Sequence, residues 1–197
     1  MIILVDNLSC KQYTFIMENK KVYFNIKTIC QIAIFSALLC IMAQIAIPMP
    51  VGVPFTLQTL GIMLAGIILG TRKGTVAVLI YVFMGMAGLP VFANFNSGLP
   101  TILGPTGGFI MAFPVAALII GLSFYKNKIS LLILGIILSL ILIYFLGILR
   151  FCVVLNSDPL SAVIIFLPYL VLDVVKAALA IVFGIKIKTA LKKAKLL

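Results

Sequence analysis

Long uncharged apolar runs, separated by charge clusters or by proline and glycine, set the pattern of this chain. The first run, residues 28–47, is long enough to cross a bilayer as a helix. Further spans are predicted over residues 57–70, 74–89, 106–124, 129–149 and 168–187. A short helix before the last span is predicted to start with Asp158 as its N-cap and Pro159 as its first residue. The pattern therefore predicts an all-α integral membrane protein with six transmembrane helices.

Two uncharged loops, residues 48–56 and 90–105, interrupt these runs. The first contains three prolines and a glycine, which exclude a continuous helix. The second is long for a connection without a helix or strand of its own, and such loops are often functional. The helix over residues 57–70 is also short for a bilayer, because it rises only about 21 Å. Short helices beside uncharged loops favour backbone that lines a cavity. We therefore expect long outer loops folded over a ligand pocket.

Composition and charge place the chain in a membrane and orient it there. Hydrophobic residues make up 64% of the 197-residue chain, which is not typical of soluble domains. With six spans and the N-terminus inside, thirteen of the 15 basic residues fall on the inner side, so the positive-inside rule selects this orientation. We expect residues 1–27 to form a cytoplasmic segment, residues 28–190 the membrane domain, and residues 191–197 a basic cytoplasmic tail. Both uncharged loops then face outward.

Asp173 is the only acidic residue inside a long apolar run, and Lys176 follows it one helical turn later. A carboxylate at the centre of a bilayer costs about 2.5 to 3.5 kcal/mol, so intramembrane charges usually line a pathway or a binding site. We expect Asp173 about five residues into the last span, roughly 8 Å below its outer end. The alternative is an internal ion pair that only lets the helix tolerate both charges. We favour a site in which Asp173 accepts hydrogen bonds and Lys176 donates them. The pair suits a ligand with adjacent N–H and C=O groups.

Several classes of chemistry are not supported by the residues present. The chain has no histidine, and its 4 cysteines lack CxxC spacing, so we expect no metal site and no disulfide framework. A phosphate-binding GxxxxGK[ST] motif does not occur, so the protein is not expected to hydrolyse ATP itself. A Ser–Lys dyad is compatible with the composition, but no serine has a reason to pair with Lys176. We therefore predict neither an enzyme nor a cofactor, and no nucleic-acid partner.

A small-molecule pocket has mostly apolar and aromatic walls with a few polar groups. Besides the charged pair, the candidates for this pocket are Phe55, Thr56, Gln58, Tyr81, Phe92, Asn94, Phe95 and Asn96. For any one of the aromatic residues taken singly, contact with lipid or core packing is the favoured explanation. Ala33 and Ala37 have a small-xxx-small spacing that lets another helix approach closely. On pattern alone, internal packing explains these two alanines.

Four stretches of the chain resemble the BioY family, the biotin-binding S components of energy-coupling factor (ECF) transporters. They are residues 47–61, 88–93, 103–108 and 173–176, and they include the motifs PFTLQTLG and GPTGG. The order and spacing of these motifs make the signal specific, and the resemblance covers about residues 28–190. It implies a six-helix subunit of the bacterial cell membrane that captures biotin from outside. Its partners would be an ECF transmembrane coupling protein and a pair of ATPase subunits.

The resemblance also implies roles for individual residues. The implied biotin contacts are Asp173, Lys176, Asn94, Thr56, Gln58 and Tyr81. Ala33 and Ala37 match the family pattern that docks the first helix on the coupling protein, which favours docking over internal packing. Two other classes of function stay open: a self-sufficient secondary transporter of a small vitamin-like molecule, and a non-transporting assembly subunit. A secondary transporter usually has more than one ionisable site at the midplane, and an assembly subunit has no need of polar outer loops.

Overall fold

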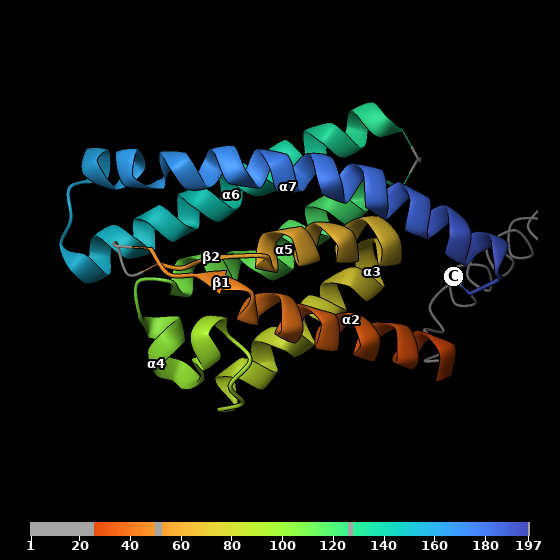
Figure 1. Ribbon diagram of the computed structural model, residues 1–197, viewed down its shortest axis with the longest axis horizontal. Helices are drawn as coiled ribbons and strands as arrows, with labels where there is room; N and C mark the ends of the chain where they lie inside the picture. Colours follow the sequence, from red (N-terminus) through yellow and green to blue (C-terminus); the bar gives the residue numbers. More distant parts are fainter. Residues whose placement is uncertain (1–25, 50–52, 126–127, 197) are drawn as a thin grey trace, which may run out of the picture.

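The computed structural model describes residues 26–49, 53–125 and 128–196. Figure 1 shows its long helices side by side in one bundle. These helices are α2 (Ile26–Gln44), α3 (Gln58–Met86), α5 (Gly107–Ser123), α6 (Ile129–Leu155) and α7 (Pro159–Lys193). The shorter elements are the strands β1 (Ala46–Ile47) and β2 (Phe55–Thr56), the 3-10 helix η1 (Ala93–Phe95) and the helix α4 (Gly98–Leu103). The predicted N-terminal segment, residues 1–27, lies outside the described residues except for its last two.

Gly70 divides α3 into two helical stretches. Its backbone has φ 76° and ψ −171°, a conformation that glycine adopts easily and other residues rarely adopt. The stretches on either side correspond to the second and third predicted spans. Four helices, α2, α3, α6 and α7, are long and apolar enough to cross a membrane, and α5 is a shorter apolar helix. With α3 counted as two, the described residues contain a helix for each of the six predicted spans. The first span was predicted too long, because α2 ends at Gln44 and residues 46 and 47 form the strand β1.

The last two long helices differ from the prediction. The predicted short helix and sixth span are one continuous helix, α7, which runs through Pro168. Packing explains this continuity, because Ala162 and Phe166 are buried against Phe151 at the end of α6. The sixth span therefore begins earlier, and Asp173 lies fourteen residues after its first residue, at a helical rise of about 21 Å instead of the expected 8 Å.

Other element boundaries also differ from those predicted from the sequence. Helix α6 continues past residue 149 to Leu155, where Asn156 ends it in a left-handed conformation with φ 50°. Asp158 is the N-cap of α7 as predicted, and its Oδ2 accepts from the amides of Leu160 and Ser161 at 3.1 and 3.2 Å. The predicted tail, residues 191–197, begins inside α7. The second uncharged loop contains two helices of its own, η1 and α4, which the sequence pattern did not predict.

Helix α5 packs between α3 and α6. A close backbone approach makes this arrangement possible at Gly121, where an added Cβ would lie 2.5 Å from the backbone nitrogen of Thr71. The buried cluster around α5 combines small and branched side chains from α2, α3 and α6. Because its helices approach so closely, the bundle has a tightly packed core on which the loops at one end are supported.

Basic residues mark one end of the bundle and the uncharged loops mark the other. At the basic end, Lys73 of α3 donates to Oε1 of Gln31 at 2.8 Å, and Lys27 of α2 donates to the carbonyl of Lys195. Lys188 lies over the ring of Phe124, 4.3 Å from its centre. In Figure 1 the end of α7 and the start of α2 lie together on the right, whereas β1, β2 and α4 lie toward the left.

Candidate ligand-binding site

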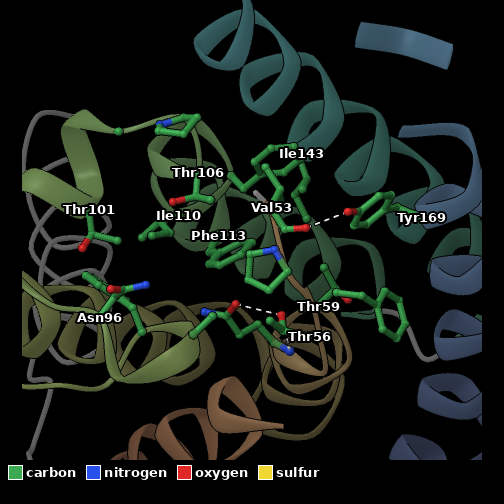
Figure 2. Close-up of a pocket in the computed structure, with 18 of the residues that line it drawn as sticks. Val53, Thr56, Thr59, Asn96, Thr101, Thr106, Ile110, Phe113, Ile143 and Tyr169 are labelled. Carbon is green, nitrogen blue, oxygen red and sulfur yellow. Dashed lines mark hydrogen bonds between the residues drawn. The ribbon is translucent and has the colours of Figure 1, made fainter. Parts of the chain in front are cut away.

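A cavity of about 400 Å³ is formed where the two loops meet α5, α6 and α7. This volume lies within the range of about 300 to 1,000 Å³ that is usual for small-molecule sites. In Figure 2, Asn96 and Thr101 lie on one side of it and Thr59 and Tyr169 on the other. Apolar side chains, among them Ile110, Phe113 and Ile143, complete the wall.

Asp173 and Lys176 both line this cavity and form an ion pair. Nζ of Lys176 lies 2.7 Å from Oδ1 of Asp173, and the two residues are only 5% and 4% exposed. Lys176 also donates to the carbonyl oxygen of Thr56 at 2.7 Å and to Oγ1 of Thr59 at 3.1 Å. Since an ammonium group has three N–H donors, all of them are used. The buried charge of Lys176 is therefore fully satisfied by protein groups.

Asp173 receives two further hydrogen bonds that the sequence analysis did not predict. The hydroxyl of Thr59 donates to Oδ1 at 2.9 Å, and the hydroxyl of Tyr144 donates to Oδ2 at 2.8 Å. Tyr144 belongs to α6, where it interrupts an apolar run that predicts only core or lipid contacts. A buried tyrosine hydroxyl normally needs a partner, and Asp173 is the carboxylate inside the spans. The need of the Tyr144 hydroxyl for a partner inside the membrane is therefore the sequence feature from which its bond to Asp173 could have been predicted.

Thr56 and Gln58 line the cavity from the segment that joins β2 to α3. Thr56 donates its hydroxyl to Oε1 of Gln58 at 2.8 Å and accepts from the Gln58 backbone amide at 3.3 Å. Nε2 of Gln58 donates to the hydroxyl of Tyr81, which is 0% exposed and does not line the cavity. The structure therefore places Tyr81 behind Gln58, where its hydroxyl orients the Gln58 amide. A direct ligand contact by Tyr81, as expected from the sequence, does not fit this position.

Of the other aromatic candidates, Phe55 and Phe92 line the cavity and Phe95 does not. Phe55 lines the cavity and its ring centre lies 3.7 Å from Nζ of Lys176, a distance typical of a cation–π contact. Phe92 is buried on the cavity wall and packs edge-to-face on Tyr81, with ring centres 5.7 Å apart. Phe95 is 69% exposed and lies away from the cavity lining. Tyr169 was not predicted, yet it lines the cavity and donates to the carbonyl of Val53 at 2.6 Å.

Asn94 and Asn96 bring amide groups to the same cavity from the loop after α3. Three more polar side chains that the sequence analysis did not select also line it: Thr59, Thr101 and Thr106. Hydroxyl and amide groups both donate and accept hydrogen bonds. The cavity thus joins one buried charged pair, a set of neutral polar groups and a large apolar and aromatic surface.

Comparison with known proteins decides the family. The sequence matches the BioY family over residues 17–193. The chain belongs to the BioY family. It is 40% identical over 161 residues to "Probable biotin transporter BioY" of Pyrococcus horikoshii, a match that covers 80% of this chain and 94% of the relative. It is 35% identical over 156 residues to "Biotin transporter BioY" of Thermotoga maritima, with 79% and 92% covered.

A solved structure agrees with this assignment. The structure described as "the S-component for biotin from an ECF-type ABC transporter" matches with a TM-score of 0.77 and 30% identity, covering 83% of this chain and 92% of that one. The family and the all-α membrane fold expected from the sequence motifs are therefore confirmed. Its BioY relatives carry the names of transporters, not of enzymes. The protein is a multi-pass membrane protein of a transporter family.

Proposed function

We propose that this protein captures biotin from outside the cell and delivers it for ATP-driven uptake. One observation carries the proposal: the buried ion pair of Asp173 and Lys176 stands on the wall of a cavity of about 400 Å³. Biotin combines a ureido group, which has N–H and C=O groups side by side, with an apolar ring system and an alkyl chain that ends in a carboxylate. The polar cluster of the cavity suits the first part, and the aromatic wall suits the second.

The hydrogen bonds of Asp173 leave room for such a ligand. A carboxylate offers about four acceptor positions, and three of them receive donors from Lys176, Thr59 and Tyr144. One position remains on Oδ2, which can accept one ureido N–H. The amide of Gln58, which also lines the cavity, is able to donate to the ureido oxygen. The relatives named as biotin transporters support this choice of ligand over other cyclic ureas.

The direction of capture follows from charge. The basic end of the bundle is expected to face the cytoplasm, which places both chain termini inside. The two loops, and with them the cavity, then face outward, so ligand enters from outside.

Energy for uptake would come from partners: an ECF transmembrane coupling protein and ATPase subunits. The chain carries no phosphate-binding motif of its own. Ala33 and Ala37 are exposed on α2, so internal packing of this described helix does not explain their spacing. Together with the exposed Ile34 and Ile41, they offer an apolar surface that another helix can approach closely. The solved S component, described as part of an ECF-type ABC transporter, supports this assignment.

The decisive experiment is to purify the protein alone and measure binding. We expect biotin to co-purify or to bind with one molecule per chain by titration calorimetry. Liposomes that contain only this protein should take up no biotin, and uptake should require the coupling protein, the ATPases and ATP. A different co-purified molecule would overturn the choice of biotin. Uptake by the protein alone would favour the self-sufficient transporter instead.

A further inference from the structure

Gln44, the last residue of α2, binds the loop that follows α3. Its Nε2 donates to the carbonyl oxygen of Phe92 at 3.0 Å and to that of Pro90 at 3.4 Å. Its Oε1 accepts from the backbone amide of Phe95 at 3.0 Å. One side chain of α2 therefore satisfies three backbone groups of this loop. The nearest of them in sequence belongs to Pro90, 46 residues further along the chain.

The loop needs such an anchor because its backbone is unusual. Asn94 and Phe95 are consecutive residues with φ 57°, in the left-handed region that favours glycine. Within the loop, Phe92 donates its amide to the carbonyl of Asn96 at 3.1 Å, and Asn96 donates to that of Ala93 at 3.2 Å. Such conformations persist where surrounding contacts fix them. The Phe95 side chain is exposed, so the bond from its amide to Gln44 is the contact that fixes this residue.

This turn forms part of the pocket, whereas Gln44 does not. Ala93, Asn94 and Asn96 line the cavity, and Gln44 lies outside its lining. Gln44 thus acts on the cavity only through the turn it holds. By holding the turn, Gln44 determines the position of the Asn94 and Asn96 side chains relative to Asp173 and Lys176 on α7.

The opposite wall of the cavity is attached to the same end of α2. Strand β1 follows α2 directly and pairs with β2, so that Ala46 lies opposite Thr56. The Thr56 carbonyl in turn accepts from Lys176. Both the Thr56 wall and the Asn94 wall are therefore connected to the helix that carries Ala33 and Ala37.

We propose that Gln44 is a positioning residue of the ligand pocket, which ties the turn at residues 93–96 to the end of α2. A shift of α2 is then transmitted to the asparagine side of the cavity through the Gln44 amide and to its threonine side through the β1–β2 pair. The inference rests on the proposed function for the identity of the ligand, biotin. Its geometric part concerns the protein without ligand and can be tested separately.

The test uses the full chain in lipid nanodiscs and compares three variants. Gln44→Ala removes all three bonds to the loop. Gln44→Glu keeps an acceptor for the Phe95 amide but loses the donors to Phe92 and Pro90. Gln31→Ala is the matched control, because Gln31 is also a glutamine of α2 but bonds Lys73 at the basic end. Two quantities are measured: amide hydrogen exchange of residues 92–97 without ligand, and the dissociation rate of biotin.

We expect Gln44→Ala to speed exchange at the Phe95 amide and to raise the biotin dissociation rate about tenfold, which corresponds to about 1.4 kcal/mol. Gln44→Glu should keep the Phe95 amide protected, with a smaller rise in dissociation. Gln31→Ala should change neither quantity. The inference is overturned if wild type binds biotin and Gln44→Ala leaves either exchange or dissociation unchanged. Absence of biotin binding by wild type would instead overturn the proposed function, and the exchange measurement would still decide whether Gln44 holds the turn.

Discussion

The hydroxyl of Tyr144 on α6 donates to Oδ2 of Asp173 on α7 over 2.8 Å, and so links the two helices at the cavity wall. The ring of Tyr144 is itself held edge-to-face by Phe109 of α5, with ring centres 6.2 Å apart. Helices α5 and α6 therefore help to determine which way the carboxylate on α7 faces. Because the opposite oxygen, Oδ1, is held by Lys176 and Thr59, the free acceptor position of Asp173 has a fixed direction in the cavity.

Tyr144→Phe should weaken biotin binding by about 1 to 3 kcal/mol, since it leaves one oxygen of a buried carboxylate without its donor. Tyr169→Phe is a suitable control, because that hydroxyl also lies at the cavity but bonds only the Val53 carbonyl. Titration calorimetry on both variants gives the comparison. An equal loss of affinity in the two variants would show that the bond to Asp173 has no special part in binding.

Asp173→Asn keeps the shape of the side chain but removes the negative charge beside Lys176. Binding should weaken by about 1 to 3 kcal/mol, because an acceptor for ligand N–H is replaced in part by a donor. The thermal midpoint should also fall, since a buried ammonium group loses its counter-charge. Asp158→Asn is the control, because Asp158 caps α7 away from the cavity and asparagine caps equally well. Unchanged biotin affinity in a well-folded Asp173→Asn protein would rule out a ligand contact.

Ala33→Leu combined with Ala37→Leu tests the docking surface on α2. Two bulky side chains should prevent another helix from approaching and should abolish co-purification with the coupling protein. Biotin binding by the isolated protein should stay unchanged, because both alanines are exposed and lie outside the cavity lining. Ala178→Leu is the matched control, because Ala178 is an exposed alanine of another helix, α7, and this variant should leave the complex intact. If the double variant still forms the complex, the partner docks elsewhere.

Asn96→Cys tests both the orientation and the access route. In a background without Cys10, Cys30, Cys40 and Cys152, the new thiol should react with an impermeant maleimide added to whole cells. Biotin should slow the reaction, because residue 96 lines the cavity. Labelling that requires opened membranes would reverse the orientation proposed from the charges. Labelling at the same rate with and without biotin would mean that ligand does not cover this part of the loop.

The sequence predicted the features that depend on local composition. Gly70, next to Arg72 and Lys73, was placed at the boundary between two spans, and the structure breaks α3 there. The Asp158 cap was predicted from one residue and its proline neighbour. In each case a nearby charge, proline or glycine determines the backbone, so a short window of sequence contains enough information.

Features that depend on distant contacts were not predictable in this way. Pro168 suggested the start of a helix, but the apolar residues before it are helical because they pack on α6. The partner of Tyr144 lies 29 residues away, and that of Thr59 lies 114 residues away. Gln44 lies inside the first predicted span, residues 28–47, and nothing in that pattern indicated the loop that it binds. Such contacts are set by how helices pack, which periodicity along one helix does not encode.

The length of α7 has a consequence for the lipid around the protein. Its 35 residues rise about 52 Å, whereas the hydrocarbon layer of a bilayer is about 30 Å thick. A continuous helix of this length leans away from the membrane normal or extends beyond the hydrocarbon at its ends. Because α7 carries Asp173 and Lys176 near its middle, any change in its tilt with bilayer thickness would also move the charged pair. The acyl-chain length of the host lipids would thereby influence the position of the charged pair in the pocket.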